Sequence, residues 1–529
     1  MIDARTRALL GVALATTTLF ASADARATGF TDIGQDITPR EKVEAAISGY
    51  LRTRGEAFYN LDLDRGLTPS GQPLFPVSSS DPSAQTFTNW DMRLRTDLAV
   101  YAPGEMVAVK ARIDFLDNLV LGSMPDGIPA ASTSQRAGGD MVRVKRAYGE
   151  AKLPFGLLAA GRMGAHWGLG MLSNGGDCLD CDSGDSADRL ALLTPLAGHI
   201  FAAAYDFSST GPQTPRGIQG KTIGFEPSTD VRSVTLAVLR WSDDTVRERR
   251  RKAGKGTVEY GSFIAHRWQS NDVPATYLPT AQPIPISSSQ IMMRGYRATA
   301  FDAWAKVVFP SVRIEAEFAY LAATVDQASL LPGVLLREPA KSRQIGLAME
   351  SHIGAPESAF GGGLDAGYAS GDPAPGFGAN AAPNAPAPKP GDLDGAQASP
   401  PRDMRVDNFR FHPDYRVDRI LFREIIGTVT DAVYARPHVK LRLFQTTSGS
   451  ITASLAAIGS MAMFASSTPG GKRPLGIELD PTIAYEGRDG LAVALEHAIL
   501  FPLAGLDNTA ANLAAKPAQL VRIRLAYRF

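Results

Sequence analysis

Apolar and polar side chains alternate one by one along several stretches of the chain. In the last ten residues, LVRIRLAYRF, apolar and aromatic residues hold one parity, and Arg522, Arg524 and Arg528 hold the other. Successive side chains of a β-strand point to opposite faces, so each such stretch has one apolar and one polar face. The same alternation predicts further strands near residues 50–62, 89–101, 107–115, 312–320 and 475–485.

Short and long connections alternate between the predicted strands. Tight links such as Pro103-Gly104 and Ser448-Gly449-Ser450 are followed by long links at 63–88, 119–140, 170–187, 270–290, 371–408 and 466–474. Outer-membrane barrels have short periplasmic turns and long extracellular loops. We therefore predict an all-β fold, a transmembrane antiparallel up-and-down β-barrel of about 18 strands, with 16 as the smaller alternative. A barrel of this width leaves an aqueous lumen.

The N-terminal residues have the pattern of a secretory signal peptide. Arg5 and Arg7 precede an apolar run at 8–20, and Ala25-Arg26-Ala27 fits a small-x-small cleavage site. The run of about 13 residues is shorter than the about 20 that a membrane helix needs. We predict a signal peptide at 1–27 and a periplasmic stub at 28–47, followed by the barrel at 48–529.

The final strand resembles the terminal signal of bacterial outer-membrane barrels, because it ends on an aromatic residue, one further residue and Phe. Tyr527 and Phe529 occupy these positions. The resemblance implies recognition by the barrel-assembly machinery and a location in the bacterial outer membrane, with outer-membrane lipid as a partner.

Composition excludes several other classes. The 529 residues contain 54 Lys and Arg against 54 Asp and Glu, so the basic excess of a nucleic-acid-binding protein is missing. Two cysteines are too few for a disulfide scaffold. Only about 20 residues separate the predicted signal peptide from the first strand, which is too short for the plug domain of a TonB-dependent transporter. Nothing in the sequence predicts a cofactor.

Charged residues of the polar parity are expected to face the lumen, since the other face meets lipid. Basic residues cluster on the first four strands and on strands near the C-terminus, and acidic residues cluster on strands between them. The candidate pore-lining residues are Arg52, Arg54, Arg93, Arg95, Lys110, Arg112, Arg143, Lys145, Glu315, Glu317, Lys440, Arg442, Glu478, Asp480, Arg522 and Arg524. Opposed walls of unlike charge would order polar solutes and ions in the channel. Alternatively, these side chains pair across strands and fill the lumen with salt bridges.

A segment at 405–427 shows apolar residues at nearly 3.6-residue spacing and predicts an amphipathic helix. It follows a low-complexity tract rich in Ala, Pro and Gly at 371–401. We expect this helix either to fold inward and constrict the pore or to pack across the barrel mouth. The constriction candidates are Tyr415, Arg416, Arg419, Phe422 and Arg423.

Both cysteines lie in one acidic stretch, and an exported protein favours a disulfide between Cys178 and Cys181. Asp180, Asp182 and Asp185 are weak candidate ligands for Ca²⁺, which prefers several hard oxygens. The spacing departs from the EF-hand pattern, so we expect no metal and a solvated acidic surface loop.

Two segments carry a family resemblance. GRMGAHWGLGMLSNGGDCLDCD at 161–182 and NFRFHPDYRVDRILFREIIGTVTDAVYARP at 408–437 resemble signature segments of an uncharacterised family of myxobacterial outer-membrane barrels. The Gly-Arg followed by Trp-Gly-x-Gly is similar, more loosely, to a strand of alginate-export and related carbohydrate porins. The resemblance implies a barrel fold and an outer-membrane location, and it implies no activity.

The expected function is a porin-like channel for passive passage of small polar or anionic solutes, with saccharides among the candidates. The alternatives are a structural or surface-recognition barrel without transport and, less favoured, a barrel hydrolase. The seven histidines are scattered, and none is paired with a nucleophile at strand spacing, so no enzyme is expected.

Overall fold

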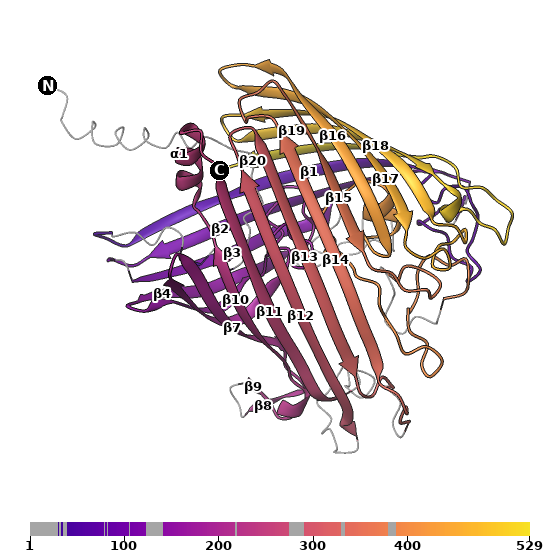
Figure 1. Ribbon diagram of the computed structural model, residues 1–529, viewed down its shortest axis with the longest axis horizontal. Coiled ribbons are helices and arrows are strands. Elements are labelled where there is room, and N and C mark those ends of the chain that lie inside the picture. The colour runs from indigo at the N-terminus through magenta and orange to yellow at the C-terminus, as the bar shows by residue number, and fades with distance from the viewer. Residues whose placement is uncertain are drawn as a thin grey trace.

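A computed structural model describes residues 30, 33–34, 40–78, 80–81, 83–104, 106–122, 141–216, 220–273, 290–329, 334–378 and 388–529. In these residues 18 strands form one antiparallel sheet, and β1 pairs with both β2 and β20, so the sheet is closed. Figure 1 shows the long strands wrapping round the molecule. The predicted all-β barrel of about 18 strands is confirmed. The predicted signal peptide lies outside the described residues.

The wall strands are β1 (Glu44–Tyr59), β2 (Thr86–Tyr101), β3 (Val107–Val120), β4 (Val142–Leu153), β5 (Gly156–Gly164), β6 (Ser186–Leu196), β7 (His199–Ser209), β10 (Val231–Arg240), β11 (Thr257–Asp272), β12 (Met292–Val308), β13 (Val312–Val325), β14 (Ala340–Ile353), β15 (Phe360–Ala369), β16 (Ala432–Gln445), β17 (Gly449–Ala462), β18 (Pro474–Gly487), β19 (Leu491–Pro502) and β20 (Ala518–Arg528). The remaining elements are β8 (Gln213–Arg216), β9 (Lys221–Gly224), α1 (Asp244–Lys252) and the short helices η1 (Pro227–Thr229), η4 (Leu421–Ile425) and η5 (Ala504–Leu506). Strands β8 and β9 form a separate small hairpin.

The connections alternate in length as predicted. Two residues join β4 to β5 and β6 to β7, whereas 21 residues join β5 to β6 and 62 join β15 to β16. On the short-turn side, α1 occupies a basic stretch of the chain between β10 and β11. The Asp243 side chain accepts a hydrogen bond from the Val246 N–H at 2.8 Å and caps this exposed helix.

Burial is inverted relative to a soluble protein. Leu51, Val109 and Leu347 on the outer face are 44–55% exposed, while the neighbouring inward-facing Arg52 and Arg93 are fully buried. This alternation of an apolar outer face with a polar interior is that of a transmembrane β-barrel. No helix in the described part of the chain is long and apolar enough to cross a membrane.

Phe30, Ile33 and Gly34, ahead of β1, lie against the inner wall. Phe30 and Ile33 are buried in a cluster with residues of β4 to β7, β10 and β12, and the Gly34 N–H donates to Glu150 at 2.8 Å. Strand β1 begins at Glu44, four residues before the predicted start of the barrel. The other predicted domain boundaries stay predictions.

Candidate functional site in the lumen

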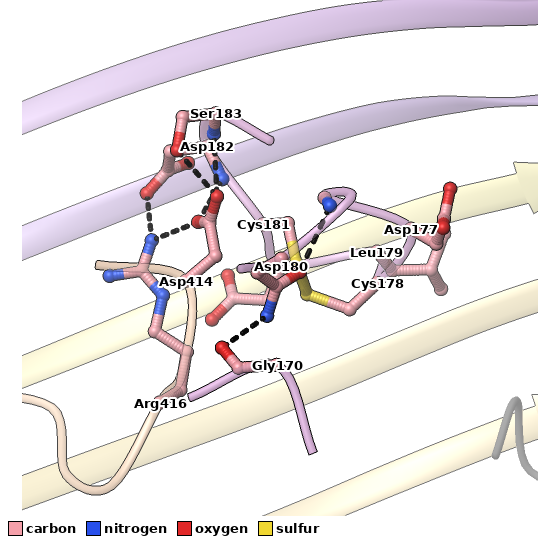
Figure 2. The surroundings of a disulfide bond; sticks show 12 residues. Gly170, Asp177, Cys178, Leu179, Asp180, Cys181, Asp182, Ser183, Asp414 and Arg416 are labelled. Carbon is pink, nitrogen blue, oxygen red and sulfur yellow. Dashed lines mark hydrogen bonds and ion pairs between the residues drawn. A yellow bond between two sulfur atoms is a disulfide. The ribbon is translucent and has the colours of Figure 1, made fainter. Parts of the chain in front are cut away.

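Two loops fold into the lumen and meet there. One is the cysteine loop, residues 165–185 between β5 and β6, and the other is the inward segment, residues 405–431 between β15 and β16. The Asp414 carboxylate accepts hydrogen bonds from the Asp182 N–H at 2.7 Å, the Ser183 N–H at 3.0 Å and the Ser183 hydroxyl at 2.6 Å (Figure 2). The two loops therefore form one connected insert.

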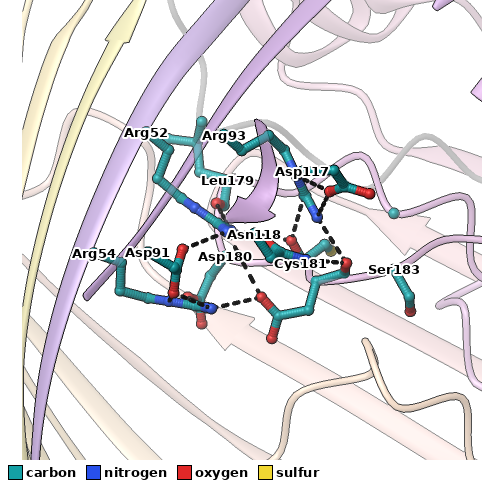
Figure 3. A network of polar contacts seen from close by, with 12 residues as sticks. Arg52, Arg54, Asp91, Arg93, Asp117, Asn118, Leu179, Asp180, Cys181 and Ser183 are labelled. Carbon is teal, nitrogen blue, oxygen red and sulfur yellow. Dashed lines mark hydrogen bonds and ion pairs between the residues drawn. The ribbon is translucent and has the colours of Figure 1, made fainter. Parts of the chain in front are cut away.

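Arginines of β1 and β2 bind the backbone of the cysteine loop. Arg52 donates to the carbonyl oxygens of Leu179 and Cys181 at 3.0 and 3.1 Å, and Arg93 donates to those of Cys181 and Asp182, both at 2.7 Å (Figure 3). Both guanidinium groups are fully buried. A rigid fork of N–H donors suits this task, because it can bind two carbonyl groups at once.

The carboxylates of the cysteine loop lie among further arginines. Asp180 pairs with Arg54 at 3.2 Å, with Arg522 and Arg524 at 3.5 Å each, and with Arg423 of the inward segment. Asp177 makes the equivalent contacts with Arg112 and Arg146 of β3 and β4. Asp177 and Asp180 thus tie the insert to the basic strands.

Asp182 joins all three parts. It pairs with Arg54 at 2.8 Å, with Arg416 at 2.6 Å and with Arg423 at 3.4 Å. Burial raises the pKa of Asp182, but the charges of Arg54, Arg423 and Arg416 outweigh it and hold this pKa at about 2. Asp182 is therefore ionised at neutral pH and keeps its ion pairs.

Acidic residues of β13 and β18 also bind the insert. Glu478 of β18 accepts the N–H groups of Arg419 at 2.8 Å, Ile420 at 2.9 Å and Leu421 at 3.0 Å. Glu317 of β13 accepts those of Met171 and Leu172 at 3.3 and 3.2 Å. Acidic wall side chains thus satisfy N–H groups of both loops, as basic ones satisfy their carbonyl and carboxylate oxygens.

The predicted amphipathic helix at 405–427 is wrong. Only one helical turn, η4, forms within the segment. The N–H groups at 419–421 are bound by Glu478, and those of Phe422 and Arg423 are bound by the Asp418 carboxylate, so wall and local side chains replace a longer helix. The expectation that the segment folds inward fits its position, with Phe422 2% exposed and packed against the inner wall.

The constriction candidates all lie in this insert. Arg416 and Arg423 bind the cysteine loop, and the Arg419 guanidinium donates to Thr482 of β18 at 2.7 Å. Tyr415 lies between the ring of Phe411, 5.4 Å away between centroids, and the Tyr434 hydroxyl of β16, at 3.4 Å.

The expectation of a solvated acidic surface loop is also wrong. Cys178 and Cys181 form a disulfide, and Cys181 is 1% exposed inside the barrel (Figure 2). Guanidinium groups surround Asp180 and Asp182 and would repel a cation, while Asp185 accepts from the Ser173 hydroxyl and the Asn174 N–H. The described residues contain no cluster able to hold a metal ion.

The other pore-lining candidates divide between paired and peripheral positions. Arg95 pairs with Asp114 at 2.7 Å, Lys110 with Glu150 at 2.8 Å, and Asp480 with Arg419 at 4.0 Å. Glu315 accepts from the Trp304 indole N–H at 2.8 Å and pairs with Lys306 and Arg313. Arg143 pairs with Asp117 at 3.5 Å and is 54% exposed, and Lys145 lies at a β-bulge between β3 and β4.

The expected cluster of basic residues near the C-terminus does not hold together, because β16 lies apart from β20. Strands β17, β18 and β19 separate β16 from β20, and Glu478, Asp480 and Glu496 lie on two of them. Lys440 is exposed, and Arg442 donates to the carbonyl oxygens of the turn between β14 and β15. The basic wall consists of β1 to β4 and β20.

Several partners in this network were missing from the predicted site. Asp91 and Asp114 share the parity of the lumen arginines and bind Arg54 and Arg95, so alternation along β2 and β3 could have identified them. Asp414 gives no comparable signal, because it binds Asp182 on a loop 232 residues away in sequence. The described contacts follow the alternative in which lumen side chains pair and fill the interior.

Comparisons with known proteins give structural likenesses alone. No family model and no curated protein matches the chain. The outer membrane protein OpdK from Pseudomonas aeruginosa matches with a TM-score of 0.46 and 10% identity, over 92% of this chain and 98% of that chain. Pseudomonas aeruginosa OccK9 (OpdG) matches with a TM-score of 0.45 and 14% identity, over 92% of this chain and 98% of that chain. The outer membrane channel DcaP of Acinetobacter baumannii matches with a TM-score of 0.38 and 10% identity, over 93% of this chain and 99% of that chain.

Proposed function

We propose that the protein is an outer-membrane channel for passive passage of small polar or anionic solutes, saccharides among them. The single observation that carries this proposal is the lumen: a closed 18-strand barrel whose charged interior is narrowed by two inward loops joined at Asp414. Barrels of this size enclose an aqueous channel unless other elements fill it. The insert then sets the size and charge of the passage.

Accessible cations in the lumen support the proposal that anionic solutes pass. Arg143 lies at the loop end of β4 with 54% of its side chain exposed, while its partner Asp117 is 2% exposed and also bound to Arg93. Lys440 on the opposite part of the wall is exposed as well. A solute that enters from the loop side meets a guanidinium group before any buried carboxylate, which favours anions.

The location follows from the same proposal. The apolar outer face, the signal-peptide pattern and the final residues Tyr527 and Phe529 together fit export and insertion by the barrel-assembly machinery. In β20, Tyr527 is 50% exposed on the outer face. We also propose that the protein is a member of the myxobacterial barrel family. We propose no enzymatic activity.

The direct test is single-channel recording of the refolded protein in a planar bilayer under a salt gradient. Discrete steps with a reversal potential of the sign for anions are expected. An Arg143→Glu variant should move that potential toward cation preference, whereas Arg249→Glu on the exposed face of α1 should leave it unchanged. Discrete steps with cation preference would contradict the anionic assignment.

A second candidate, a structural or surface-recognition barrel without transport, is favoured by the packing of the insert. Phe411, Ile420 and Ile426 are at most 1% exposed and form one apolar cluster with the inner wall. An absence of channel steps from protein that circular dichroism shows to be folded would support this second candidate.

A further inference from the structure

The outer face carries a row of cations and aromatic rings across β7 and β10 to β14. Strand register places Phe207, Arg232, Trp268, Arg297, Thr324 and Lys341 directly opposite one another across β7, β10, β11, β12, β13 and β14. We call these six residues the basic row. Neighbouring strands lie about 4.8 Å apart, so the three cations repeat on alternate strands about 10 Å apart.

The basic row lies next to the apolar surface, at the end of the strands that bears long loops. Four residues further along the same strands, toward the short turns, stand Leu236, Ile264, Phe301, Tyr320 and Ile345, each 37–54% exposed. Between the two rows lie His266, Thr299 and Arg343. A polar, aromatic level therefore borders a wholly apolar one, which is the profile of a lipid molecule with its headgroup uppermost.

The row borders an open surface cavity of about 510 Å³. Its lining combines a charged pair, Arg297 and Asp326, with Trp268 and Met293. The rings of His266 and Trp268 stack there, with centroids 5.9 Å apart and planes 19° apart. Such a lining can hold a ligand that is charged at one end and apolar at the other.

The cations of the row keep binding capacity. Asp326 accepts both of its 2.9 Å bonds from one terminal nitrogen of Arg297, whose side chain is 59% exposed. Arg232 donates to Asp230 and to the Ser209 carbonyl oxygen and lies 5.0 Å from the Phe207 ring centroid. The exposed Lys341 has no ion pair with a residue in the described ranges.

Strands β16 to β19 differ. The corresponding outward row at the loop end of β16 to β19 consists of Ala435, Gly459, Ile477 and Phe501, without a charge. An aromatic girdle alone would surround the barrel evenly. The evenly spaced row of cations is therefore a feature of β10 to β14 that β16 to β19 do not share.

We propose that the basic row and its cavity bind the phosphate-bearing headgroup of an outer-leaflet lipid, with the acyl chains on the apolar rows below. Guanidinium and ammonium groups recognise phosphate, and Arg can do so through two hydrogen bonds. Trp268 and Tyr320 provide ring surfaces beside the headgroup and the upper acyl chains. This inference uses the membrane location in the proposed function and is independent of transport.

The test is native mass spectrometry of the folded protein with lipid A, with phosphatidylcholine as the comparison lipid. Arg232→Gln/Arg297→Gln/Lys341→Gln should weaken lipid A binding by about a hundredfold, from the contribution of a cation near an anionic lipid surface. The matched control, Arg249→Gln/Arg250→Gln/Lys252→Gln, removes three cations from α1 at the other end of the barrel and should bind as the wild type does.

Other outcomes decide against the proposal. Equal lipid A binding by the row variant and the wild type would overturn it, as would displacement of lipid A by inorganic phosphate alone, which would indicate a free-anion site. Should the triple variant fail to fold, Lys341→Gln alone should weaken binding by about fivefold. Single-channel conductance should be the same in the wild type, the row variant and the α1 control. Failure of the lipid proposal can therefore be distinguished from failure of the channel proposal.

Discussion

The two walls of the lumen hold the same insert by opposite chemistry. The basic wall, β1 to β4 and β20, presents buried guanidinium groups to loop carbonyls and to Asp177, Asp180 and Asp182. The acidic wall, β13, β18 and β19, presents Glu317 and Glu478 to loop N–H groups. A buried backbone segment has donors and acceptors that both need partners, and walls of unlike charge satisfy both sets.

The two attachments differ in strength. The carboxylates of Asp177, Asp180 and Asp182 form ion pairs on the basic side, so removing one partner leaves a buried charge unpaired, which costs about 3–5 kcal/mol. On the acidic side Glu317 and Glu478 accept hydrogen bonds from neutral N–H groups, worth about 1.5–3 kcal/mol each, and the ion pairs of Arg419 with Asp480 and Glu496 are longer, at 4.0 and 3.6 Å. We therefore expect the basic wall to dominate the position of the insert.

The largest effect should come from Asp180→Asn/Asp182→Asn. This variant removes the loop charges that Arg54, Arg416 and Arg423 share, and it should lower the unfolding free energy by at least about 3 kcal/mol. Thermal unfolding in detergent followed by circular dichroism measures the loss. Asp64→Asn, which removes a surface carboxylate paired with Lys516, is the matched control and should change stability by less than about 1 kcal/mol.

A smaller effect is expected on the acidic side. Glu478→Gln keeps one acceptor oxygen for the N–H groups of 419–421 and replaces the other by an NH2 donor, so the inward segment should loosen while the cysteine loop keeps its arginine contacts. We expect a loss of about 1.5–3 kcal/mol. Hydrogen exchange should quicken at 417–426 and stay slow at 176–183. Faster exchange in both segments would contradict separate attachments.

The two sides should also respond oppositely to pH. Asp182 has a pKa of about 2, below its ordinary value of 3.8, so its contribution is present above pH 4 and is lost as pH falls toward 2. Burial, together with the charge of Asp480, raises the pKa of Asp418 to about 7. The folded protein then retains a proton that the unfolded chain releases, so this contribution declines as pH rises from about 4 to 7. The unfolding free energy measured across pH 2–8 should therefore fall at both ends. Asp418→Asn should reduce the decline on the neutral side and leave the decline on the acid side unchanged.

The smallest effect should come from removing the disulfide. Cys178→Ser/Cys181→Ser opens a cross-link between residues only three apart, for which the chain-entropy relation gives about 2 kcal/mol. The carbonyl groups that bind Arg52 and Arg93 belong to the backbone and remain, so the loop should keep its place. Unchanged protection of this loop in hydrogen exchange would support this prediction. A loss of protection as large as that in Asp180→Asn/Asp182→Asn would contradict it.

Local alternation was enough to predict the barrel. Residues such as Arg52, Arg93 and Arg522 share the parity that faces the interior, so wall strands and many lumen side chains could be derived from the sequence. The insert could not, because its conformation depends on partners far away in sequence. The spacing of Ile420, Leu421 and Phe422 is helical, yet Glu478, 57 residues later, binds the N–H groups that would begin a helix.

The position of the cysteine loop could not be predicted for a similar reason. Its acidic residues resemble a solvated surface when only the sequence is considered, and the arginines that draw Asp180 and Asp182 inward lie on β1 and β20 and in the inward segment. Ion pairs between distant segments leave no periodic pattern. Parity predicts which side chains face the lumen, and it does not predict which loops enter it.

The central claim, that the insert held between the two walls limits the passage, is tested most directly by single-channel conductance. Deleting residues 405–427 removes the inward segment and its arginines, and Asp414→Asn weakens only the junction with the cysteine loop. The account predicts a severalfold rise in conductance for the deletion and a smaller rise for Asp414→Asn. Conductance equal to that of the wild type in a folded deletion variant would contradict it.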